Sequence, residues 1–150
     1  MATRQATAEP ATATTALAGY RRAVDLIYGY LLAAFVLAVL VQIYLAGVGA
    51  FGRHQAGAFD PHENLGHALG IGAGVIFVLA LVAHQSLRTM IWALVLALLT
   101  EVAQEGLASG GRSDKWIGGL HAFDAALILA LSVWLLLVWR RRQKAVVTDG

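Results

Sequence analysis

The sequence of 150 residues contains no cysteine, only two prolines and only 13% charged residues. The absence of cysteine excludes disulfides, thiolate metal ligands and thiol redox chemistry, so a redox function would need a cofactor. The chain also lacks a phosphate-binding glycine loop, a Gly-x-Ser-x-Gly nucleophile motif and the paired histidines of zinc proteases. These absences leave little support for an enzymatic activity.

Long apolar stretches make up most of the chain, and its hydrophobic content is 59%. The stretches are residues 24–50, 65–83, 90–108 and 116–139. Each reaches roughly the 20 residues that an α-helix needs to cross about 30 Å of hydrocarbon. The composition is far from that of soluble domains and argues against a soluble bundle. We therefore predict an all-α integral membrane protein, a four-helix bundle in up-down-up-down order.

The boundaries of the bundle follow from the same stretches. We expect a disordered N-terminal tail at residues 1–19, a bundle at residues 20–140 and a cytoplasmic tail at residues 141–150. The expected spans are residues 24–50, 62–87, 89–108 and 116–139. At the start of the second span, Asp60 is the expected N-cap residue, with Pro61 and Glu63 in the first turn.

Basic residues are distributed unevenly between the two ends of the predicted spans. On the side of both termini and the turn at residues 84–89 lie Arg4, Arg21, Arg22, Arg88, Arg140, Arg141, Arg142 and Lys144. Only Arg53, Arg112 and Lys115 lie on the opposite side. Because short loops rich in Lys and Arg stay in the cytoplasm, we predict a multi-pass protein of the bacterial plasma membrane with both termini cytoplasmic. The lipid bilayer is then the expected partner, and the basic balance does not require nucleic-acid binding.

Ionisable side chains gather near the outer end of the predicted spans. They are His62, His67, His121, Glu101, Glu105 and Asp124. Ionisable groups inside membrane spans are costly, which makes this cluster the first place to look for a function.

The depth of each histidine follows from its distance to the start of its span. His67 lies about 7 Å deeper than His62 and is rotated from it by about 140°, so the two imidazoles face different directions. His121 has about the same depth as His67, on a helix that runs the same way. Gly70 and Gly74 follow His67 on one face and leave room beside it. Equal depth and adjacent glycines suit a flat macrocycle held between two imidazoles, although small residues also serve helix packing alone.

A family resemblance appears at these residues. The segments at residues 59–66 and 120–126, together with the end of the first span at residues 42–47, resemble DUF6220, a family of small four-span bacterial membrane proteins of unknown function. The resemblance covers roughly residues 24–140 and implies relatives without implying an activity.

The placement of histidines also resembles one four-helix half of haem A synthases and, more loosely, b-type membrane cytochromes. Those families bind haem through histidine pairs across the bundle, and the resemblance implies His62 and His121 as ligands. The depth argument favours His67 with His121, so the ligand on the second span stays open between His62 and His67. The chain lacks the second four-helix half of haem A synthases and the second histidine pair of many b-type cytochromes.

The resulting hypothesis is one b-type haem near the outer face, in a redox or haem-handling role. Three alternatives use the same residues. A single divalent metal would be bound by His67, His121, Glu101, Glu105 and Asp124. A proton pathway would use the carboxylates, and a structural or accessory subunit would use the polar groups only to hold helices together. Such a subunit would act in a larger membrane or respiratory complex or as a homo-oligomer.

Overall fold

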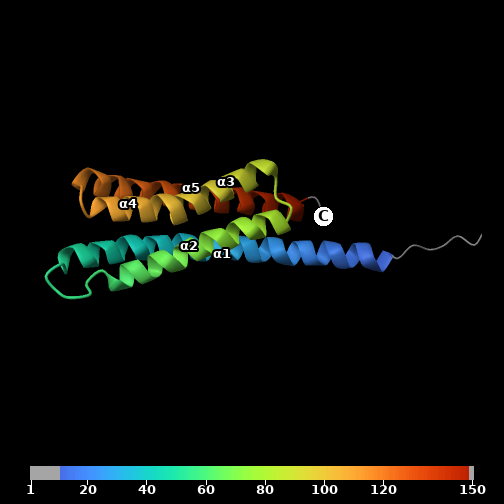
Figure 1. Cartoon of the computed structure of the whole chain (residues 1–150). Coiled ribbons are helices and arrows are strands. Elements are labelled where there is room, and N and C mark those ends of the chain that lie inside the picture. Colours follow the sequence, from blue (N-terminus) through green and yellow to red (C-terminus); the bar gives the residue numbers. More distant parts are fainter. Residues whose placement is uncertain (1–10, 149–150) are drawn as a thin grey trace, which may run out of the picture.

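The computed structural model describes residues 11–148, and its residues form four antiparallel helical rods (Figure 1). In chain order the elements are α1 (Ala11–Phe51), α2 (Asp60–Val82), α3 (Leu87–Leu98), the π-helical segment η1 (Leu99–Ala103), α4 (Gln104–Gly111) and α5 (Lys115–Thr148). Because α3, η1 and α4 follow one another without a break, they form a single rod. The predicted all-α, up-down-up-down arrangement is confirmed.

All four rods have the length and composition of membrane spans. The qualifying segments are Thr15–Phe51, Asp60–Val82, Leu87–Gly111 and Lys115–Ala145, with mean hydropathies from 1.5 to 2.5. Large apolar side chains are exposed along every rod, which suits contact with lipid. The fold is therefore that of a multi-pass membrane protein.

Several predicted boundaries need correction. The helix α1 begins at Ala11, so residues 11–19 are helical and do not form a disordered tail, while residues 1–10 lie outside the described part of the chain. At the other end, α5 continues to Thr148, through most of the expected tail at residues 141–150. In both cases the helix continues beyond the apolar stretch that marked its expected limit.

The second span also differs at both of its ends. Phe59, rather than Asp60, is the N-cap residue, and it makes no side-chain capping hydrogen bond. The helix ends at Val82 and not at residue 87, because a turn at residues 83–86 reverses the chain. In this turn His84 adopts a positive φ of 50°. The next helix begins after Ser86, whose hydroxyl accepts a hydrogen bond from the backbone N–H of Thr89 at 3.3 Å.

Apolar side chains fill the middle of the bundle. The main ones are Tyr28, Leu32, Phe35, Val39, Leu69, Ala73, Ile76, Leu96, Ile128 and Leu135, which come from all four rods. In lipid the hydrophobic effect between helices is small, so close packing supplies most of their attraction. Small residues make this packing possible: Ala73, Ala80 and Ala93 are fully buried. At Gly29 a Cβ atom would overlap the ring of Trp139.

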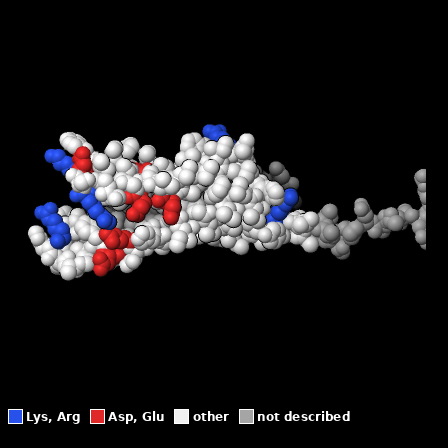
Figure 2. Space-filling model, viewed as in Figure 1, with Lys and Arg blue, Asp and Glu red and all other residues white. Residues whose placement is uncertain are grey.

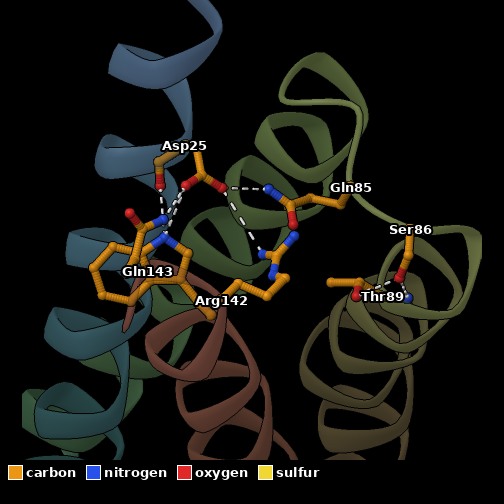
Figure 3. Close-up of polar contacts among 7 residues, drawn as sticks. Asp25, Gln85, Ser86, Thr89, Arg142 and Gln143 are labelled. Carbon is orange, nitrogen blue, oxygen red and sulfur yellow. Dashed lines mark hydrogen bonds and ion pairs between the residues drawn. The ribbon is translucent and has the colours of Figure 1, made fainter. Parts of the chain in front are cut away.

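A polar cluster closes the bundle at the end that holds the C-terminus, and we call it the Asp25 cluster (Figure 3). The Asp25 carboxylate accepts hydrogen bonds from Gln85 Nε2 at 2.6 Å, from Trp139 Nε1 at 3.2 Å and from Gln143 Nε2. Trp139 Nε1 also donates to the Asp25 main-chain oxygen at 3.0 Å, and Arg142 Nη2 lies 3.8 Å from Oδ1. The cluster thereby connects α1, the turn after α2 and α5.

Candidate functional site

A pocket opens at the end of the bundle opposite the Asp25 cluster, between α1 and α2 on one side and α4 and α5 on the other. Its volume is about 710 Å³. Among its lining residues are His62, His67, His121, Glu63, Glu101 and Glu105. Figure 2 shows acidic side chains gathered around a hollow in this half of the molecule, with basic side chains beyond them. The ionisable residues that the sequence places at one end of the bundle therefore line a pocket.

His62 and His121 face each other in this pocket. Their ring centroids lie 6.3 Å apart, and the ring planes are inclined by 73°. His67 also lines the pocket, but it is exposed and no ring contact with His121 is recorded in residues 11–148. Residue counting measures depth correctly only when parallel helices start at one level. Here the first turn of α2 and the second turn of α5 lie together, so the His62 ring, and not the His67 ring, contacts His121.

Each of the two histidines is held by a glutamine of the neighbouring helix, and the same hydrogen bonds occur twice. On the first side, Gln42 Nε2 donates to the His62 main-chain oxygen at 2.9 Å, and His62 Nδ1 lies 3.1 Å from the Gln42 main-chain oxygen. On the second side, Gln104 Nε2 donates to the His121 main-chain oxygen at 3.1 Å, and His121 Nδ1 lies 3.2 Å from the Gln104 main-chain oxygen. We call each unit a Gln–His clamp.

The clamps determine which ring nitrogen carries the proton. A main-chain carbonyl oxygen only accepts hydrogen bonds, so Nδ1 of both His62 and His121 must be the donor. In a neutral imidazole the remaining Nε2 atom then carries the lone pair. At His62 the Gln42 Nε2 atom lies 3.5 Å from Nε2 and can donate to it. Histidines that bind metals show this arrangement, because a bond from the second nitrogen to a carbonyl fixes the tautomer and the ring orientation.

The three carboxylates of the predicted cluster differ in their surroundings. Asp124 is buried and accepts a hydrogen bond from Gln104 Nε2 at 3.0 Å, so it serves the second clamp. Glu101 and Glu105 line the pocket from the third rod. Within residues 11–148, no group of three or more His, Asp or Glu side chains is arranged to hold a metal ion. Of the five residues of the metal hypothesis, Asp124 does not line the pocket, and the other four do.

The two glycines predicted beside the cofactor lie elsewhere. Gly70 and Gly74 line a second, smaller cavity between α2 and the third rod. At Gly70 a Cβ atom would overlap the Glu101 carboxylate, whereas at Gly74 it would meet no atom within 4 Å. These glycines therefore flank Glu101 and an open space rather than the two facing histidines.

Sequence reasoning missed Gln104 and the π-helical segment that precedes it. Gln104 begins α4, and its backbone N–H bonds to the Leu99 carbonyl oxygen, five residues earlier. A signal for Gln104 was present, because a glutamine precedes the paired histidine by 20 residues in the first half and by 17 in the second.

The fold and the pocket define a small multi-pass helical membrane protein with two facing, clamped histidines. Residues 42–110 match the model of DUF6220, a family of unknown function. The predicted resemblance is confirmed over this segment, which includes the first clamp and Gln104 and ends before His121. No curated protein and no solved structure matches the chain.

Proposed function

We propose that the protein binds one b-type haem through His62 and His121, in a redox or haem-handling role. The observation that supports this proposal is the repeated Gln–His clamp, in which Nδ1 of each of two facing imidazoles bonds to a main-chain oxygen and Nε2 carries the lone pair for a ligand. At His62 the ligand would replace the 3.5 Å contact of Nε2 with Gln42 Nε2. A clamp on one histidine would be an ordinary helix contact. Two clamps that share the same pair of main-chain hydrogen bonds, around one pocket, favour a ligand that takes one nitrogen from each side.

The dimensions of the site are compatible with this ligand. Bonds from imidazole nitrogen to a first-row metal are about 2.0–2.1 Å long, so two imidazoles on opposite sides of one metal have ring centroids about 6 Å apart. The observed centroid distance is 6.3 Å. The cavity of about 710 Å³ lies in the range of small-molecule sites, about 300–1,000 Å³. A bound haem would supply one-electron chemistry that the cysteine-free chain lacks.

The other pocket residues have separate tasks in this proposal. Gln42 and Gln104 keep the two imidazoles in the Nδ1-protonated tautomer and in a fixed orientation. Arg112 also lines the pocket and provides a cation suited to a carboxylate of the ligand. Thus both the donor nitrogens and a countercharge come from residues around a single cavity.

Haem titration of the purified protein in detergent tests the proposal. We expect a Soret band with the spectrum of a six-coordinate low-spin haem at one haem per chain. His62→Ala and His121→Ala should each abolish this spectrum and weaken haem binding by about tenfold or more, because each removes one axial nitrogen. His67→Ala is the matched control and should keep the spectrum.

Two results would contradict the haem proposal. One is the absence of a Soret band after addition of haemin to folded wild-type protein. The other is a spectrum that persists in the His62→Ala, His121→Ala double variant. Metal analysis of the same preparation distinguishes a bound divalent ion, and a preparation with neither haem nor metal would favour the accessory-subunit alternative.

We further propose that the protein lies in a bacterial plasma membrane with both termini in the cytoplasm. The proposal rests on the excess of Lys and Arg at the terminal end of the bundle. The chain has no native cysteine, so a single introduced cysteine reports its own location. In intact cells, Gln55→Cys should react with a membrane-impermeant maleimide and Arg88→Cys should not. The reverse pattern would overturn the orientation.

A further inference from the structure

Two tryptophans and an arginine lie together between α3 and α5, in the half of the bundle that holds the Asp25 cluster. The rings of Trp92 on α3 and Trp134 on α5 have centroids 6.0 Å apart, with an interplanar angle of 69°. The guanidinium carbon of Arg88, one turn before Trp92, lies 5.9 Å from the centroid of the Trp134 ring. A cation over an indole face is attracted by the ring, so the three side chains support one another. We call them the Trp–Arg stack.

The Trp–Arg stack lies where hydrocarbon meets the lipid headgroups. Arg88 is the second residue of its span, which begins at Leu87. Trp92 is 39% exposed, and the apolar side chains of Leu87 and Ile91 beside the stack are 70% and 51% exposed. Tryptophan is enriched at this depth of a membrane because its ring is apolar and its N–H group is polar. The stack therefore combines an apolar surface for acyl chains with a cation at the level of the phosphates.

A second arginine lies beyond the indoles on the same side of the bundle. Arg141 follows Trp134 by seven residues, two turns further along α5, and therefore lies on the same face of the helix. Arg88 and Arg141 are both exposed. In residues 11–148 the ion pair present joins Arg142 to Asp25, so no carboxylate there neutralises Arg88 or Arg141. Guanidinium groups are weakly hydrated and match the oxygens of a phosphate, which makes them suited to a phosphodiester.

The charge around the stack is strongly positive. Within the described ranges, the basic residues toward this end are Arg21, Arg22, Arg88, Arg140, Arg141, Arg142 and Lys144, and the acidic one is Asp25. The other acidic residues between positions 11 and 148 belong to the opposite half, namely Asp60, Glu63, Glu101, Glu105, Asp114 and Asp124. On the face in Figure 2, the coloured side chains toward the terminal end are all basic. This end of the bundle is therefore complementary to an anionic headgroup.

We propose that the Trp–Arg stack and Arg141 bind one anionic phospholipid, with its phosphodiester on the two arginines and its acyl chains along Trp92 and the exposed apolar side chains of α3. Charge complementarity favours an anionic headgroup, because a zwitterionic lipid brings a cation of its own to the same arginines. The apolar surface directly beside the arginines favours a lipid over a soluble phosphate, which would make no use of that surface. The site depends on the membrane spans and not on haem binding.

Lipid titration of the delipidated protein in detergent, followed by native mass spectrometry, tests the proposal. We expect the first phosphatidylglycerol molecule to bind about tenfold more tightly than phosphatidylcholine with the same acyl chains, because two arginines attract its net charge. The double variant Arg88→Gln, Arg141→Gln should lose this preference. The matched control is Arg53→Gln, Lys115→Gln at the opposite end of the bundle, which removes the same charge and should keep the preference.

Fluorescence quenching locates the bound lipid. Phosphatidylglycerol with brominated acyl chains, as a minor component of phosphatidylcholine vesicles, should quench more indole fluorescence than brominated phosphatidylcholine at the same fraction. The reason is that phosphatidylglycerol collects beside Trp92 and Trp134. The excess quenching should disappear in the double variant Trp92→Phe, Trp134→Phe, which retains the exposed Trp116 at the opposite end and the buried Trp139.

Four results would overturn the proposal, and circular dichroism confirms that each variant is folded. The first is equal affinity of the wild-type protein for the two lipids. The second is a preference that persists in the folded Arg88→Gln, Arg141→Gln variant or is lost equally in the control. The third is excess quenching that persists without Trp92 and Trp134. The fourth is displacement of phosphatidylglycerol by inorganic phosphate, which would assign the arginines to a soluble anion.

Discussion

At the scale of single residues, the two glutamines are as important for the geometry of the site as the histidines. Gln104 bonds through its side-chain amide both to the His121 main-chain oxygen and to the Asp124 carboxylate. Gln42 bonds through its amide to the His62 main-chain oxygen at 2.9 Å. Each amide therefore fixes the distance between two helices and the orientation of an imidazole ring. Without the amide, both the distance and the orientation should vary more.

The first prediction concerns these amides. Gln104→Leu and Gln42→Leu should each weaken haem binding by about tenfold, as is usual when groups that support a metal ligand are removed. Leucine keeps the volume and the main-chain oxygen, so the effect isolates the amide. Gln55→Leu, on the exposed loop after α1, is the control. Wild-type haem affinity in both clamp variants would show that the amides do not support the ligands.

The identity of the paired histidine was only partly predictable at this scale. Residue type and position at the end of the spans opposite the termini selected His62, His67 and His121, and all three line one pocket. Their pairing depends on how far each helix extends beyond its neighbour, and residue counts within one helix do not contain that quantity. The role of Asp124 was missed for a related reason, because its partner Gln104 carries no charge to mark it.

At the scale of elements, the π-helical segment η1 sets the direction of the third rod's polar side chains. The bond from the Gln104 N–H to the Leu99 carbonyl spans five residues, one more than in an α-helix. The segment η1 therefore contains one residue more than a regular α-helix would need there. The helices α3 and α4 still continue as a single rod. This excess allows Leu96 to face the core and Gln104 to reach α5 on the same rod.

The second prediction follows from that excess residue. Deletion of Val102 should convert η1 into regular α-helix. Because α3 and α4 retain their positions, the Gln104 clamp should stay in place. Haem binding should then remain within about threefold of wild type. Deletion of Leu94, a lipid-facing residue in regular helix, should rotate everything after it by about 100° and abolish haem binding. Equal effects of the two deletions in a haem titration would contradict the assignment.

At the scale of the whole molecule, polar contacts hold both ends of the bundle and an apolar core holds the middle. The four spans were predictable because length and hydropathy determine membrane crossing. The Asp25 cluster was not, since Asp25 is separated by 60 residues from Gln85 and by 118 from Gln143. Only the antiparallel return of all four rods brings these residues to one end.

The third prediction concerns the stability of this assembly. Asp25→Ala should lower the free energy of unfolding by about 1–3 kcal/mol, because it leaves the side-chain donors of Gln85 and Gln143 without their acceptor. Trp139 keeps its hydrogen bond to the main-chain oxygen of residue 25. Asp25→Asn retains one acceptor oxygen and should lose less. Thermal unfolding in detergent, followed by circular dichroism, measures both. If Asp25→Ala is as stable as wild type, the apolar core alone holds the four rods together. Haem binding at the opposite end of the bundle should persist in either variant.

A layer of buried apolar side chains also separates the two polar ends of the bundle. Buried side chains such as Leu32, Ile76 and Leu135 separate the two-histidine pocket from the Asp25 cluster. A hydrated ion that entered the pocket would have to give up its water to proceed, at the high cost of charge in hydrocarbon. We therefore expect a membrane with many copies of the protein to keep its ion gradients and its voltage.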